Sequence, residues 1–289
     1  MQAPLAPRFA LLAGLGLGCG AGPQEAEAQL TFATRPGYPS TTSRLGSSLG
    51  GNLQKNCHAT LVHPSWALTA AHCFSDVEPE ARGTLKEFGR GFSASDIEFY
   101  PGAHASGETQ LGRHWQRADF VAAHDLALVP LRPPVRDVPP VVAWRPNEQC
   151  GVSGSAVVIG EIGIEGQDGE AMTAEAAILG PIEAERLLGP GHPGWLVAAR
   201  GPAVGPGDSG SGVTAVWSAI EPAAPGCEPL STGAAQVLLV GIVQDANALD
   251  PSLPFGLVPI YGPDHARWLQ HRFDATPVAA NPLPPRLPP

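Results

Sequence analysis

Apolar runs in this chain are short, and turn residues interrupt them throughout. Two such runs are Ala59–Val62 and Trp66–Ala70, which the turn-like residues 63–65 separate. No long helical periodicity appears before the C-terminal end, and the 289 residues include 35 glycines and 32 prolines. Short apolar runs bounded by glycine and proline are typical of antiparallel β-sheets. The sequence therefore predicts an all-β fold.

A candidate nucleophile, Ser209, lies in the run Gly207-Asp208-Ser209-Gly210-Ser211-Gly212. A serine hydroxyl is a poor nucleophile, so it needs a neighbouring base and donors that hold the oxyanion formed by its attack. Glycines allow a tight turn in which the serine projects and nearby N–H groups point at one spot. An ordinary Gly/Ser turn would have the same local sequence, so other segments must decide.

The candidate base is His72, which follows the second apolar run in Ala70-Ala71-His72-Cys73. Small residues before it leave room for an imidazole at the end of a strand. Histidine titrates near neutrality and can take a proton from Ser209 and pass it to a leaving group. Asp125 opens the apolar segment 126–131. It suits a buried carboxylate that orients His72, although a turn residue at a strand start would look the same.

These three segments resemble the motifs of the chymotrypsin-like (trypsin-like) serine proteases, over residues 31–273. The motifs are TAAHC around His72, DLAL around Asp125 and GDSG around Ser209. Their order is His, Asp, Ser, whereas subtilisins run Asp, His, Ser and α/β-hydrolases run Ser, Asp/Glu, His. The resemblance implies two antiparallel six-stranded β-barrels, over residues 29–142 and 143–274, with a short C-terminal helix that begins near Pro263.

The resemblance also implies the chemistry. Ser209 is expected to attack a peptide carbonyl, His72 to shuttle the proton and Asp125 to orient His72, while the N–H groups of Gly207 and Ser209 hold the oxyanion. No metal or organic cofactor is required. The expected activity is that of a monomeric serine endopeptidase acting on polypeptides. Two alternatives stay open: a non-catalytic binding protein on the same fold, and an esterase.

Substrate preference is predicted from five pocket positions: Ala203, Val204, Gln244, Asp245 and Ala246. In the family, an aspartate six positions before the nucleophile selects lysine or arginine, and here that position is Ala203. The sequence therefore predicts an apolar or small substrate residue before the cleaved bond. Gln244-Asp245-Ala246 replaces the family's Ser-Trp-Gly, which pairs with the substrate backbone, and Asp245 or Asp250 turned inward would instead attract a basic residue.

Maturation in the family frees an N-terminal amine, which pairs with the aspartate before the nucleophile, here Asp208. No terminus of the usual Ile-Val-Gly-Gly kind is visible, and Thr31–Thr34 occupies about its place. The activation step therefore stays open.

Residues 1–28 have the pattern of an export signal, with Arg8, the apolar run Phe9–Gly18 and a final Ala-Glu-Ala. An exported bacterial member of the family is the interpretation that we favour, and a lipoprotein anchored through Cys19 is the alternative. Removing or lipidating Cys19 leaves four cysteines, which predicts two disulfides with three possible pairings. The resemblance favours Cys57–Cys73 and Cys150–Cys227.

The net charge and the spacing of the histidines argue against nucleic acid, anionic membranes and metal ions as partners. A net charge of −10 argues against nucleic acid and anionic membranes as partners. Five histidines outside the motif match no metal-binding spacing, so no metal site is predicted, and they are interpreted as surface residues: His58, His63, His104, His114 and His124. Residues 275–289 are proline-rich and are predicted to be a disordered tail.

Overall fold

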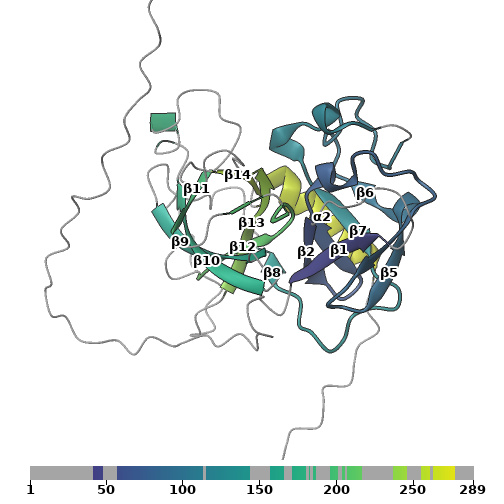
Figure 1. Ribbon diagram of the computed structural model, residues 1–289, viewed down its shortest axis with the longest axis horizontal. Coiled ribbons are helices and arrows are strands. Elements are labelled where there is room, and N and C mark those ends of the chain that lie inside the picture. Colours follow the sequence, from purple (N-terminus) through teal and green to yellow (C-terminus); the bar gives the residue numbers. More distant parts are fainter. Residues whose placement is uncertain are drawn as a thin grey trace, which may run out of the picture. The chain divides into compact units, whose positions relative to one another are not determined.

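The computed structural model describes residues 42–47, 57–112, 115–143, 157–165, 171–179, 182, 185–186, 196–200, 204–205, 207–216, 237–245, 255–260 and 263–276 (Figure 1). These belong to the unit Phe32–Pro289. The predicted export signal and the tail from residue 277 onward lie outside the described residues. So do seven residues that the sequence singled out: Cys19, His114, Cys150, Ala203, Cys227, Ala246 and Asp250.

The described strands form two β-sheets, so the predicted all-β fold with one C-terminal helix is confirmed. The first sheet has the order β5-β4-β1-β2-β3-β7-β6. Its strands are β1 (Thr42–Ser47), β2 (Cys57–His63), β3 (Trp66–Thr69), β4 (Arg82–Leu85), β5 (Arg90–Ser93), β6 (Glu98–Phe99) and β7 (Ala127–Pro130). All neighbours in this sheet are antiparallel.

The second sheet has the order β12-β9-β10-β11-β14-β13-β8. Its strands are β8 (Val142–Ala143), β9 (Val157–Glu165), β10 (Ala171–Leu179), β11 (Leu196–Arg200), β12 (Gly212–Val216), β13 (Val237–Asp245) and β14 (Phe255–Pro259). Because β12 pairs with both β9 and β13, six of these strands close into a ring. Each sheet has seven strands rather than the predicted six. In each, one strand is only two residues long, β6 in the first and β8 in the second.

Both faces of strand β2 are buried. Side chains alternate along a strand, so every second residue points the same way. Ala59 and Leu61 are fully buried in the core of the first sheet. His58 and Thr60 lie on the opposite face and are buried too, against the loop that carries Ser209 and the start of β12. One strand therefore serves both as core and as a support for the candidate nucleophile.

Helix α2 (Pro263–Ala275) begins at the predicted proline and runs past Gln270. Its buried residues are His265, Trp268, Leu269 and Phe273, a spacing that places them on one face of a helix. The indole N–H of Trp268 donates to Glu98 Oε1 at 3.3 Å, and Arg272 forms an ion pair with the same carboxylate. The helix thus packs on the first sheet. Helices in the described part of the chain are too short or too polar to cross a lipid bilayer.

Candidate active site

His72 lies in a short 3₁₀ helix, η1 (Ala71–Phe74), directly after β3. A disulfide joins Cys73 to Cys57 at the start of β2, with a Cα–Cα distance of 6.2 Å. This confirms the first of the two pairings that the resemblance favours, whereas both cysteines of the second lie outside the described residues. The disulfide fixes the residue next to His72 to the neighbouring strand.

Strand pairing explains why Asp125 meets His72. Strands β3 and β7 are antiparallel, with Thr69 opposite Ala127, so the residues after β3 and those before β7 lie at the same end of the sheet. His72 comes three residues after Thr69, and Asp125 comes two before Ala127. A backbone hydrogen bond of 3.3 Å from Ala71 N–H to the Asp125 carbonyl joins the two segments directly.

The Asp125 carboxylate holds His72 at two points. One oxygen accepts from His72 Nδ1 at 2.6 Å, and the other accepts from the His72 backbone N–H at 2.8 Å. The exposed fraction is 1% for Asp125 and 3% for His72. Because a carboxylate only accepts, Nδ1 carries the proton, and in the neutral ring the lone pair is on Nε2. Among the described residues, Nε2 has no hydrogen-bond partner, which leaves it as an available base.

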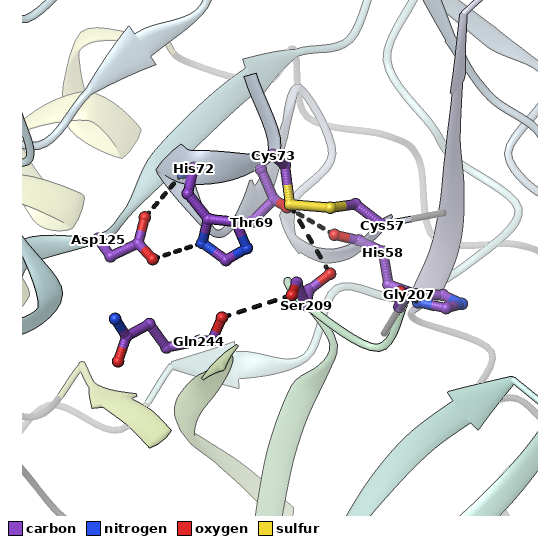
Figure 2. The surroundings of a disulfide bond; sticks show 9 residues. All are labelled: Cys57, His58, Thr69, His72, Cys73, Asp125, Gly207, Ser209 and Gln244. Atoms are coloured by element: carbon purple, nitrogen blue, oxygen red, sulfur yellow. Dashed lines mark hydrogen bonds and ion pairs between the residues drawn. A yellow bond between two sulfur atoms is a disulfide. The ribbon is translucent and has the colours of Figure 1, made fainter. Parts of the chain in front are cut away.

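Ser209 lies in a loop that hydrogen bonds fasten to both sheets. Its carbonyl accepts from the His58 backbone N–H at 2.8 Å, on β2. On the other side, Gly210 N–H donates to the Val243 carbonyl at 2.8 Å, on β13. Cys73 Sγ lies 3.9 Å from the Ser209 carbonyl oxygen, so the loop reaches the residue that follows His72. In Figure 2 the imidazole of His72 lies between Asp125 and Ser209.

The Ser209 hydroxyl donates to the Gln244 carbonyl at 3.4 Å rather than to His72 (Figure 2). A rotation about the serine Cα–Cβ bond would redirect the hydroxyl. Catalytic hydrogen bonds are often loose without substrate and tighten in the complex. In this structure the Ser209 hydroxyl is therefore not hydrogen-bonded to the His72 ring.

Ser209 lies in residues 207–211, which we call the nucleophile loop. Two glycines allow this loop to take its shape. Gly207 and Gly210 have φ values of +113° and +86°, which residues with a side chain rarely adopt. A Cβ on Gly210 would lie 2.0 Å from the His58 carbonyl oxygen and 2.2 Å from Thr69 Oγ1. Within the described residues, neither Gly207 N–H nor Ser209 N–H donates a backbone hydrogen bond, so both predicted oxyanion donors have capacity for a ligand.

Asp208 turns back onto its own loop. Its Oδ2 accepts from Gly205 N–H at 2.7 Å, and its own N–H donates to the Gly205 carbonyl at 3.2 Å. Asp208 is buried. The resemblance pairs this aspartate with a freed N-terminal amine, and the segment that would supply the amine lies outside the described residues.

The predicted pocket residues are only partly described. Val204 is buried, and Gln244 lies on β13 with its carbonyl toward Ser209. Asp245 ends β13 opposite Gly256. The structure thus brings Gln244 to Ser209, and the pocket roles of all five residues stay predictions.

A cluster of potential metal ligands lies at this site. Cys57, His72 and Cys73 have ligand atoms within 4.8 Å of one another. Both sulfurs are consumed in the disulfide, so neither offers a thiolate, and His72 Nδ1 is held by Asp125. This donor set does not fit a metal ion.

Two of the histidines predicted at the surface are buried. His58 was expected at the surface, yet its exposed fraction is 0% and its ring contacts the nucleophile loop. The available signal was its place on β2, two residues from Thr60 and out of phase with Ala59 and Leu61. His104 is buried as well, stacked on Trp115 with ring centroids 3.9 Å apart.

Comparisons with known proteins agree with this geometry. Residues 37–215, more than half of the chain, match the family described as Trypsin. Kallikrein-related peptidase 10 is similar in structure, with a TM-score of 0.52 and 19% identity over 82% of this chain and 97% of that one. Human heparin binding protein is similar too, with a TM-score of 0.52 and 13% identity over 86% and 97%. No curated protein matches the sequence. At these identities the structural likeness shows the fold alone.

Proposed function

Since the chain belongs to the trypsin family, we propose that it is an active serine endopeptidase with Ser209 as nucleophile, His72 as base and Asp125 as the residue that orients the base. The observation that carries the proposal is the buried Asp125–His72 pair at 2.6 Å, next to the loop that presents Ser209. If the Asp125–His72 hydrogen bond served only the fold, the other ring nitrogen of His72 would not need to be left without a partner. Among the described residues, Nε2 has none.

The proposed reaction is acyl transfer. The Ser209 hydroxyl leaves the Gln244 carbonyl, gives its proton to His72 Nε2 and attacks the substrate carbonyl. Asp125 keeps the proton on Nδ1 and stabilises the imidazolium. The N–H groups of Gly207 and Ser209 hold the oxyanion, each worth about 3 kcal/mol in comparable sites.

The second half of the reaction reverses these roles. The imidazolium of His72 protonates the leaving amine as the tetrahedral intermediate collapses to an acyl-enzyme. Water then attacks the acyl carbon, gives a proton to His72 and releases the acid, and Ser209 regains its hydrogen. Protons and bonds balance without another reactant.

The substrate preference that we propose is an apolar or small residue before the cleaved bond. Its support is the absence of an acid at Ala203 and Val204, and the burial of Val204. Chromogenic peptides that differ only at this residue test it. Faster cleavage after alanine, valine or leucine is expected, and a clear preference for arginine or lysine would assign the pocket floor to Asp245 or Asp250 instead.

Secretion is proposed on two grounds. The Cys57–Cys73 disulfide suits an oxidising compartment, and the first 28 residues have an export pattern. Mass spectrometry of the protein recovered from its native host would distinguish cleavage after Ala28 from a lipid on Cys19.

A second candidate is a binding protein without activity. The hydrogen bond from Ser209 to Gln244 favours it, because a dead site would have no need of a Ser209–His72 contact. One structural neighbour is named for heparin binding. A polyanion such as heparin is a poor ligand for a chain with net charge −10.

Labelling with a fluorophosphonate probe tests the proposal. Mature protein should be labelled, whereas Ser209→Ala and His72→Ala should lose labelling while they keep the unfolding transition of the wild type. A folded wild type that stays unlabelled, also after limited proteolysis near residues 28–45, would support the binding protein. Turnover of esters without cleavage of any peptide would support the esterase.

A further inference from the structure

His58 is a buried titratable residue that the mechanism above does not use. It lies on β2, on the face opposite the core residues Ala59 and Leu61, with an exposed fraction of 0%. Its ring Nδ1 is 2.8 Å from the carbonyl oxygen of Gly207 (Figure 2). A buried imidazole aimed at the backbone of the nucleophile loop requires a reason beyond packing.

The backbone of His58 contacts the same loop. Its N–H donates to the Ser209 carbonyl at 2.8 Å, and its own carbonyl accepts from Thr69 Oγ1 at 2.6 Å. His58 therefore holds two carbonyls of the loop, that of Gly207 through its side chain and that of Ser209 through its backbone. Thr69 in turn fixes the orientation of the His58 peptide.

The Gly207 carbonyl determines which nitrogen of the His58 ring carries a proton. A carbonyl oxygen only accepts hydrogen bonds, so His58 Nδ1 must carry a proton to make this contact. In a buried site such a bond is stronger than in water, and breaking it would leave an unpaired polar group.

Gly207 is the residue for which such a bond matters most. Its φ is +113°, a value that residues with a side chain rarely adopt. Glycine can also change this conformation more easily than any other residue, so the loop needs something that fixes it. Fixing its carbonyl fixes the rotation of the peptide that links Gly207 to Asp208. The two proposed oxyanion donors, Gly207 N–H and Ser209 N–H, lie on either side of that linkage.

We propose that His58 is a positioning residue for the oxyanion hole: its Nδ1–H holds the Gly207 carbonyl so that the N–H groups of Gly207 and Ser209 converge on one point. This role rests on the proposed protease function. It acts in the transition state, when charge develops on the substrate oxygen, and not in binding of the ground state.

Two substitutions separate this role from packing. In His58→Asn, the side-chain amide nitrogen is as many bonds from Cβ as Nδ1 is, so a donor remains. His58→Leu keeps a buried side chain of moderate volume and removes the donor. Losing an oxyanion donor costs about 10²–10³ in kcat, so a misplaced one is expected to cost about tenfold to a hundredfold.

Kinetics with a peptide substrate give the first readout. His58→Leu should lower kcat about tenfold to a hundredfold with KM within about threefold, and His58→Asn should restore kcat to within about threefold of the wild type. An unchanged kcat in His58→Leu would overturn the proposal, and so would a His58→Asn variant that is as slow as His58→Leu. Unfolding curves ensure that each rate is measured on folded protein.

Nitrogen-15 NMR of histidine-labelled Ser209→Ala protein gives a second readout that needs no activity. The resonance pair lost in a matching His58→Asn sample identifies His58, and it should show the Nδ1–H tautomer. The Nε2–H tautomer would overturn the proposal. A wild type that fails to react with the fluorophosphonate probe would instead refute the protease function, so the two failures are distinguishable.

Discussion

At the scale of single residues, the site depends on which atom carries each proton. Asp125 accepts from both the ring and the backbone of His72, so one carboxylate sets both the tautomer and the position of the His72 ring. An amide in its place has only one accepting oxygen. It must give up one of the two bonds or force the imidazole to become an acceptor at Nδ1.

Asp125→Asn should therefore reduce kcat by about four orders of magnitude, the scale of the same change in comparable triads. The fold should be preserved, because the amide has nearly the same shape. The measurement is the rate of fluorophosphonate labelling together with peptide hydrolysis. A variant within about tenfold of the wild type would mean that Asp125 does not orient the base.

Gly210 offers a second prediction at this scale. Gly210→Ala should lower the free energy of unfolding by about 2–5 kcal/mol, because it adds backbone strain to two contacts near 2 Å. Gly89→Ala is the matched control: its φ is also positive, at +60°, but nothing lies within 4 Å of the added Cβ. Urea unfolding of both variants should show a much smaller loss for Gly89→Ala, and equal losses would contradict the steric account.

His63, the last residue of β2, predicts a dependence of stability on pH. Burial lowers the pKa of His63 from its ordinary value of 6.5. Its Nδ1 accepts from Ser65 N–H at 3.2 Å, and the ring stacks on Phe273. Because the folded pKa lies below the unfolded one, the unfolded state binds more protons between the two values, and stability falls as the pH drops through 6.5.

The test is urea unfolding between about pH 5 and pH 8, the range in which histidine side chains change their protonation. His63→Gln retains an acceptor for Ser65 but does not titrate, so its stability should decline less steeply below pH 6.5 than that of the wild type. Identical pH profiles for the two proteins would show that His63 contributes nothing to this dependence.

At the scale of elements, the hairpin β2–β3 organises the site. One face of β2 fills the core, the other supports the nucleophile loop, and the end of β3 leads into His72. The disulfide closes a loop of 16 residues around this hairpin. It therefore acts on the shape of the site as well as on the unfolded chain.

Replacing Cys57 and Cys73 together by serine should lower the free energy of unfolding by about 3 kcal/mol, as loop-closure entropy predicts. The rate of probe labelling should fall as well, because Cys73 follows His72 and touches the Ser209 carbonyl. Denaturant unfolding and labelling are measured on the same samples. A loss of stability with an unchanged labelling rate would limit the disulfide to a structural role.

Elements also show what the sequence could predict. The hairpin and the start of α2 follow local patterns and were predicted near their observed bounds. Strand β10 was missed, although Ala174, Ala176 and Ile178 are buried alternately with the exposed Thr173 and Glu175. Alanine has a weak preference for strands, so the alternation carried little hydrophobic contrast. The contacts of His58 and Gln244 with the nucleophile loop join residues far apart in sequence, which no local pattern encodes.

At the scale of the whole molecule, the segments of the proposed triad come from both sheets. His72 and Asp125 flank strands of the first sheet, whereas Ser209 precedes β12 of the second. The order His, Asp, Ser could be read from the sequence because each residue sits in a short local motif. The distances that assemble them depend on the pairing of β3 with β7 and on the loop contacts with β2 and β13.

Helix α2 has a consequence for how the chain can be shortened. It follows the last strand, yet Trp268, Leu269 and Phe273 belong to the core that also contains Leu68, next to the segment of His72. Removing residues 263–275 would therefore uncover apolar side chains of the first sheet, so the segment that carries His72 depends on a helix almost two hundred residues further along the chain.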